Sequence, residues 1–174
     1  MLNRLNDVLI KFILANESRK NLTIGLVNSV IEKFNSNKII DFTFKDREFS
    51  SESYSAKSCR LDVLGKTDSN ANVNLEVQVK KLNDYDKRDL FYWAKIFSSD
   101  LAAGQPYANL NKTININILD FVLFPYEDTP DFHNCFKIKN MMYPNHLYSD
   151  DLEIHIPIHS NIFSYWNLLL HCST

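Results

Sequence analysis

The feature that most constrains this chain is the alternation of polar and apolar residues in N-V-N-L-E-V-Q-V, residues 72–79. Successive side chains of a β-strand point to opposite faces, so this segment predicts a strand with two unlike faces. The apolar face consists of Val73, Leu75, Val77 and Val79. The polar face consists of Asn74, Glu76, Gln78 and Lys80. We expect the apolar face to enter a core, whereas packing alone does not explain the polar face.

A second strand is expected just before this one. The segment R-L-D-V-L-G lies in a predicted strand at about 57–66, and T-D-S-N-A-N supplies turn residues before the strand at about 72–81. The two strands therefore predict a β-hairpin. In this hairpin Asp62 on one strand neighbours Glu76 and Gln78 on the other. Carboxylate and amide oxygens in such an arrangement can hold a divalent metal ion.

The remaining segments predict helices around a mixed sheet. Helices are expected at about 7–15, capped by Asn6, at about 21–34, and at about 84–103, where Gly104 and Pro106 end the helix. Strands are expected at 38–46, at 113–124, and as peripheral strands at 135–142 and 152–159, where Pro157 favours an edge position. This order predicts an α/β or α+β fold with a central mixed β-sheet flanked by helices.

Length and composition narrow the class of protein. A chain of 174 residues is expected to form one domain, and 45% hydrophobic residues argue against disorder. The charged N-terminal segment predicts an amphipathic helix rather than a signal peptide, and no apolar run approaches the roughly 18 residues of a membrane span. Three cysteines, Cys59, Cys135 and Cys172, have no framework spacing, which favours a reducing compartment such as the cytoplasm.

Charge and short motifs exclude some functions. The net charge of −2 does not favour nucleic acid, but Lys and Arg outnumber Asp and Glu in residues 1–119 and the reverse holds in 120–174. A surface for a polyanion is therefore expected in the first two-thirds of the chain. The spacings His133-x-Cys135 and His155-x₃-His159 lack the regular pairing of a structural zinc site. The motif G-x-x-x-x-G-K-[ST] does not occur, which excludes a P-loop at the level of the sequence. The motif G-x-S-x-G does not occur either, so the best-known signature of a serine hydrolase is absent.

Six segments in a fixed order carry a family resemblance. They are N-D-V-L-I-K-F-I-L, R-L-D-V-L-G, N-L-E-V-Q-V, R-D-L-F-Y-W, A-A-G-Q-P-Y-A-N-L and I-N-I-L-D-F. Together, from about Asn6 to Glu153, they resemble the PD-(D/E)XK nuclease superfamily, and more narrowly the bacterial recombination-promoting nuclease and putative transposase family. The resemblance implies a restriction-endonuclease-like core in residues 1–159. It also implies metal-dependent hydrolysis of DNA phosphodiesters, associated with transposition or recombination.

The resemblance also implies site residues. It places the first catalytic acid at Asp62, the second at Glu76, and Gln78 where relatives carry Lys. It further implies that the carbonyl of Val77 is a metal ligand, that the ion is Mg²⁺ with Mn²⁺ able to substitute, and that Asp7 is an additional acid. Gln78 cannot act as a general base because an amide does not titrate, but it can orient water or bind phosphate.

Other residues are candidates for contacts with DNA. Lys80 follows on the polar strand face, about 6.6 Å beyond Gln78 at roughly 3.3 Å per residue. The candidates for contacts with the DNA backbone are Lys80, Lys57 and Arg88, and those for contacts with substrate are Tyr92 and Tyr107.

Each candidate also has a structural interpretation. Asp62 can pair with Arg60 or Lys81 on a solvated face, and Asp7 suits the first turn of a helix. Gln78 and Lys80 can be ordinary polar residues at a strand end, and tyrosines on helices commonly belong to the core. Two rival functions follow: an inactive remnant that binds DNA or a protein partner without cleavage, and an interaction module unrelated to DNA.

The C-terminal segment, residues 160–174, departs from the family pattern. It is rich in His, Ser and apolar residues, as the end of a truncated or frameshifted gene would be. We expect it to contribute little to the site. Its apolar residues are sufficient to form a helix or a surface patch, and a homodimer through that patch is one expected assembly.

Overall fold

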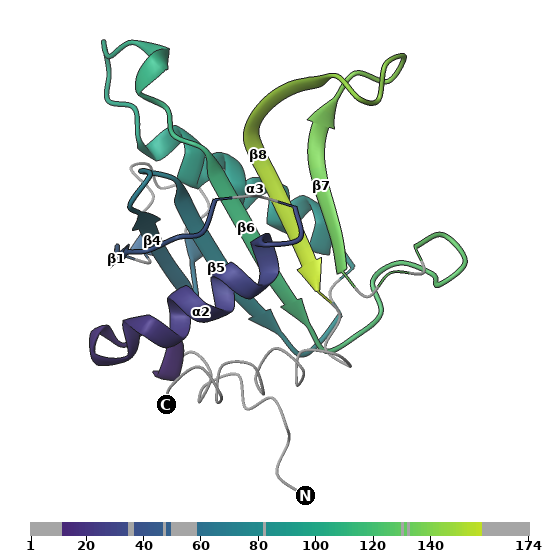
Figure 1. Cartoon of the computed structure of the whole chain (residues 1–174), viewed down its shortest axis with the longest axis horizontal. Helices are drawn as coiled ribbons and strands as arrows, with labels where there is room; N and C mark the ends of the chain where they lie inside the picture. The colour runs from purple at the N-terminus through teal and green to yellow at the C-terminus, as the bar shows by residue number, and fades with distance from the viewer. Residues whose placement is uncertain are drawn as a thin grey trace, which may run out of the picture.

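The computed structural model describes residues 12–34, 37–46, 48–49, 59–81, 83–129, 131 and 133–157. Across these residues its centre is a six-stranded sheet in the order β1-β4-β5-β6-β8-β7 (Figure 1). The strands are β1 (Phe42–Phe44), β4 (Val63–Thr67), β5 (Asn72–Gln78), β6 (Thr113–Leu119), β7 (His133–Lys139) and β8 (Leu147–Pro157). A separate pair is formed by β2 (Glu48–Phe49) and β3 (Cys59–Arg60), and the helical elements are η1 (Glu17–Arg19), α2 (Lys20–Ile31), α3 (Tyr85–Ser99) and η2 (Tyr107–Asn109).

The predicted hairpin is present as β4 and β5, which pair antiparallel with Val63 opposite Leu75. Asn70 in its turn has a φ of 65°, a conformation that asparagine adopts more readily than most residues. β5 and β6 are parallel, and a parallel pair needs a crossover connection, which α3 provides. The mixed sheet with its helices confirms the predicted α/β class.

The apolar face of β5 packs as the alternation predicts. Val73, Leu75 and Val77 are buried in one core with residues of α2 and β6. The α2 side chains in this core are Leu26, Val27, Val30 and Ile31, and those of β6 are Ile114, Ile116 and Ile118. Figure 1 shows α2 in front of the sheet and α3 behind it. The polar face of β5 is therefore covered by α3.

The position predicted for Pro157 is wrong. β8 lies between β6 and β7 and is not an edge strand, and Pro157 is opposite His133 of β7. β6 pairs with β8 only from Leu152 to His155, so Pro157 lies beyond the last residue that needs a hydrogen bond to β6. The missing N–H of proline therefore costs the sheet little at this position.

The helices differ in detail from the expectation. α3 ends at Ser99, before the expected end at residue 103, and its buried residues are Tyr85, Asp89 and Ile96 rather than the expected stripe through Leu90 and Ala94. Residues 12–14 are helical, as expected for the first helix. Its predicted cap, Asn6, and its predicted acid, Asp7, lie outside the described residues. None of the described helices has the length and apolar character needed to cross a bilayer.

Candidate active site

Asp62 and Glu76 meet at the end of the β4–β5 hairpin opposite the turn. The backbone N–H of Asp62 donates to Glu76 Oε1 at 3.2 Å, and the backbone N–H of Val77 donates to Asp62 Oδ2 at 2.9 Å. Each carboxylate is thus held by the backbone of the neighbouring segment. The structure brings the two acids together as the hairpin register predicts; that they bind a metal stays a prediction.

The site is partly sequestered from water by α3. Glu76 is only 5% exposed, and Asp62 is half-buried. Burial raises the pKa of the Tyr85 phenol, and the charges of Asp89, Glu76 and Asp62 raise it further, against an opposing effect of Arg88. Tyr85 therefore remains a neutral hydroxyl among several charged groups.

The backbone of Val77 faces the same side as the Asp62 carboxylate. A residue in a β-strand directs its N–H and its C=O toward the same neighbouring strand. Because the Val77 N–H donates to Asp62, the Val77 carbonyl is directed toward the β4 side as well. Two carboxylates and one carbonyl make an all-oxygen donor set, which fits Mg²⁺.

Gln78 is bound to a cation from α3. Arg88 Nη2 donates to Gln78 Oε1 at 2.7 Å, and Gln78 Nε2 donates to the carbonyl of Lys80 at 3.1 Å. The Arg88 guanidinium lies 5.6 Å from the ring centroid of Tyr85 and 5.5 Å from that of Tyr92, distances typical of cation–π contacts. The cation in contact with Gln78, two residues after Glu76 on β5, therefore comes from the helix.

The remaining predicted residues lie in different places. β5 ends at Gln78, so the alternation of side chains along the strand does not determine on which face Lys80 lies. Lys80 is exposed, two residues beyond the end of the strand. Tyr92 is half-buried beneath Arg88, and Tyr107 in η2 is 81% exposed. The predicted contributions of Asp7 and Lys57 fall outside the described residues.

Sequence reasoning missed the buried acid Asp89. It lies on α3, is 6% exposed, and its Oδ1 accepts from Asn115 Nδ2 of β6 at 2.7 Å. Asn74 and Asn115 are opposite each other on β5 and β6, so the part of the sheet that Asp89 faces is polar. The available signal was the second alternating segment, I-N-I-N at 114–117, which presents asparagines to the same face as Glu76.

We expect Asp89→Asn to stabilise the fold at neutral pH by about 1 kcal/mol, the usual size of a single stabilising substitution. Burial raises the pKa of Asp89, so the folded state disfavours its ionised form. The asparagine removes that charge, and its oxygen can still accept from Asn115. Chemical denaturation at pH 7 measures the gain in the free energy of unfolding. The gain should shrink near pH 3, because aspartate is then protonated in both the folded and the unfolded state. An equal gain at both pH values would contradict this explanation.

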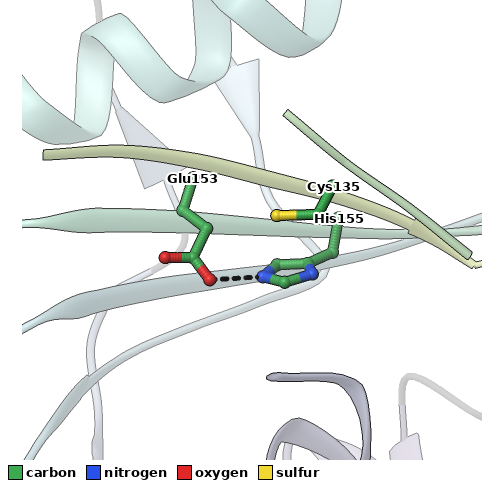
Figure 2. Close-up of side chains that lie close together, drawn as sticks. All are labelled: Cys135, Glu153 and His155. Carbon is green, nitrogen blue, oxygen red and sulfur yellow. Dashed lines mark hydrogen bonds and ion pairs between the residues drawn. The ribbon is translucent and has the colours of Figure 1, made fainter. Parts of the chain in front are cut away.

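A second group of potential ligands lies apart from this site, on β7 and β8. Cys135, Glu153 and His155 place one ligand atom each within 4.8 Å of one another (Figure 2). The spacing of histidines and cysteines along the sequence did not predict this group. Its residues come together because β7 and β8 pair with Cys135 opposite His155.

A comparison with models of protein families identifies the family of this chain. The model of the PD-(D/E)XK nuclease family transposases matches residues 4–157. The matched segment contains the hairpin with Asp62 and Glu76, all of α3, and β8 to its last residue. No curated protein and no solved structure matches the chain.

Proposed function

Because the chain belongs to the PD-(D/E)XK nuclease family transposases, we propose that it hydrolyses DNA phosphodiester bonds with Mg²⁺ held by Asp62 and Glu76. Family membership supports a nuclease-like or transposase-like function. The observation that carries the finer proposal is the reciprocal pair of hydrogen bonds that holds the two carboxylates together.

The donor groups match the chemistry of the proposed ion. Asp62 and Glu76 would each supply a carboxylate oxygen, and Val77 would supply its carbonyl. Mg²⁺ prefers oxygen ligands and keeps several waters. When bound, the ion would stabilise charge on a phosphoryl group and lower the pKa of a coordinated water.

The residues around the acids suggest how the chain positions its substrate. Gln78 cannot accept a proton, so its role is to hydrogen-bond water or phosphate. Arg88 carries a guanidinium, whose planar fork can bind two phosphate oxygens at once. We propose that Arg88 supplies the positive charge that relatives obtain from the lysine at the position of Gln78, because the two side chains are in direct contact.

Arg88→Ala is expected to slow DNA cleavage by roughly 10- to 100-fold, since a hydrogen bond from a charged group contributes about 1.5–3 kcal/mol. Arg88→Lys should give an intermediate rate because it keeps the charge but loses the fork. Lys87→Ala is the matched control, since Lys87 is an exposed cation on the same helix. Initial nicking rates measure the effect, and equal rates for Arg88→Ala and Lys87→Ala would remove Arg88 from the site.

Incubation with supercoiled plasmid tests the function. We expect Mg²⁺ to support nicking, EDTA to abolish it, and Mn²⁺ to restore it. Gln78 at the lysine position favours one alternative, a protein that binds DNA without cleaving it. Retarded migration of intact plasmid would support that alternative, whereas a folded protein that neither binds nor cleaves DNA would contradict both functions.

A further inference from the structure

Cys135, Glu153 and His155 share the face of the sheet opposite to Asp62 and Glu76. Cys135 is directly opposite His155 in the β7–β8 register, and Glu153 is two residues before His155 on the same strand. His155 and Glu153 are opposite Ile116 and Ile114 of β6, which belong to the core with α2. The group is therefore separate from the proposed DNA-cleaving site, and its side chains face one another in Figure 2.

The imidazole of His155 is fixed in position. Its Nε2 lies 2.7 Å from Glu153 Oε1, and its Nδ1 lies 3.0 Å from Nε2 of the buried His133. Phe34 packs against both imidazoles, with ring centroids 4.9 Å from His133 and 5.6 Å from His155. His155 is fully buried, so one ring nitrogen is directed at Glu153 and the other is held by a second imidazole.

We propose that Cys135, Glu153 and His155 bind one Zn²⁺ ion. A thiolate, an imidazole and a carboxylate are the ligands that zinc takes in proteins, whereas Mg²⁺ takes oxygen ligands. Zinc bonds of about 2.0–2.3 Å place tetrahedral ligand atoms roughly 3–4 Å apart. The three ligand atoms already lie within 4.8 Å of one another, so small side-chain rotations bring them to that spacing.

His133 fits the role of a residue that orients a metal ligand. A histidine bound to a metal through one nitrogen usually donates its other N–H to a neighbouring acceptor, which fixes the ring. With Nε2 on the ion, His155 would donate from Nδ1 to Nε2 of His133. The contact that this arrangement needs is therefore present.

The charges around Glu153 accommodate the ion. Lys112 and Lys137 contact Glu153 Oε2 at 2.6 and 2.9 Å, and Asp150 contacts the same two ammonium groups. Two anions and two cations therefore balance before any ion binds. The thiol proton leaves as the sulfur–metal bond forms, so the bound ion adds one net positive charge rather than two. The lysines contact Oε2, whereas Oε1 faces His155.

The ion would join an edge strand to the sheet. Cys135 lies on β7, which is the edge of the sheet, and the other two ligands lie on β8. Binding of Zn²⁺ to the folded chain alone would stabilise the fold by mass action. We therefore infer that the ion stabilises the fold, an effect that does not depend on the DNA-cleaving function.

Titration of the metal-free chain with Co²⁺, which commonly replaces zinc in tetrahedral sites, tests the proposal. We expect a thiolate-to-cobalt charge-transfer absorption in the near ultraviolet that saturates at one ion per chain and disappears on addition of Zn²⁺. Cys135→Ser should lose this absorption. The double variant Asp62→Asn/Glu76→Gln should keep it, which separates this site from the DNA-cleaving site. Absence of the absorption in folded wild-type protein would overturn the proposal.

The other two cysteines provide matched controls. Cys59→Ser and Cys172→Ser should each keep the absorption, and its loss in either variant, or its persistence in Cys135→Ser, would assign the sulfur elsewhere. Zinc-edge X-ray absorption of the wild-type chain gives an answer that does not depend on the folding of a variant. One sulfur with nitrogen and oxygen neighbours supports the site, whereas no sulfur or several sulfurs overturns it.

Discussion

Glu76→Gln and Asp62→Asn are each expected to slow Mg²⁺-dependent DNA cleavage by on the order of 10³-fold, because metal-ion catalysis is worth several kcal/mol. Both substitutions keep the size of the side chain and an oxygen that can accept the same backbone N–H. The bond from Asp62 N–H and the bond from Val77 N–H can therefore survive while the negative charge is lost. Initial rates of plasmid nicking measure the effect, and circular dichroism shows that each variant is folded.

Asp128→Asn is the control for this charge removal. Asp128 is an exposed acid outside the sheet, so its replacement should leave the nicking rate within about twofold of wild type. A folded Glu76→Gln variant that cleaves at the wild-type rate would remove Glu76 from the reaction. An equal loss in Asp128→Asn would show that the effect comes from overall charge rather than from the site.

Glu153→Gln is expected to lower the free energy of unfolding by roughly 3 kcal/mol, the cost of removing one partner from a buried ion pair. Glu153 is fully buried and contacts His155, Lys112 and Lys137. The amide would leave the two ammonium groups beside an uncharged side chain. Chemical denaturation in EDTA measures the loss without any contribution from bound metal.

Asp151→Asn is the matched control for this prediction. Asp151 is exposed on the same strand, so its replacement should change the stability by no more than about 0.5 kcal/mol. If the two variants are equally stable, the buried contacts of Glu153 do not hold the β7–β8 pair as we infer.

Stability in EDTA should fall as the solution is acidified below neutral pH. Burial lowers the pKa of His133 to about 4, and for Glu153 the bonds from His155, Lys112 and Lys137 outweigh the opposing effect of burial and hold its pKa at about 2. Both groups bind protons less readily in the folded state, so protonation favours unfolding. The contribution of His133 is lost from about pH 6.5 to 4, and that of Glu153 from about pH 4.5 to 2.

The pH dependence is checked by unfolding at pH 7, 5 and 3 for wild type and Glu153→Gln. The wild-type free energy of unfolding should decrease at each step, whereas the variant should lose less between pH 5 and 3 than wild type does. Equal losses in that interval would show that Glu153 does not titrate as its contacts indicate.

The sequence predicts the hairpin and its acids because both depend on short-range rules. A period of two separates the polar and apolar faces of residues 72–79, and the turn residues at 67–72 set the register. In that register Val63 is opposite Leu75. Because the strands are antiparallel, Asp62, which precedes Val63, lies next to Glu76, which follows Leu75. The convergence of these two residues could therefore be predicted without the fold.

The contacts of α3 could not be predicted in the same way. The bond between Arg88 and Gln78 and the bond between Asp89 and Asn115 depend on how a helix lies across two strands. The periodicity of α3 predicts an apolar stripe, but the side chains of β5 and β6 that lie beneath Asp89 are asparagines, so the helix buries Asp89 and leaves Leu90 exposed. Tertiary packing therefore overrides the helical pattern.

The group formed by Cys135, Glu153 and His155 was missed for a different reason. Motif spacing identifies ligands that lie close together along the sequence, whereas these ligands come from two strands. The relevant signal is a spacing of two residues, because side chains two residues apart on a strand point to the same face. His133 and Cys135 have this spacing, and so do Glu153 and His155. Only the register of β7 and β8 shows that the two pairs meet.

Anomalous diffraction from crystals soaked in Mn²⁺ tests the central claim most directly. We expect a manganese peak bonded to the carboxylates of Asp62 and Glu76, with the carbonyl of Val77 within reach of the ion. An ordered site in which both carboxylates keep their backbone hydrogen bonds and no manganese binds beside them would contradict the claim that this hairpin builds a metal centre for DNA hydrolysis.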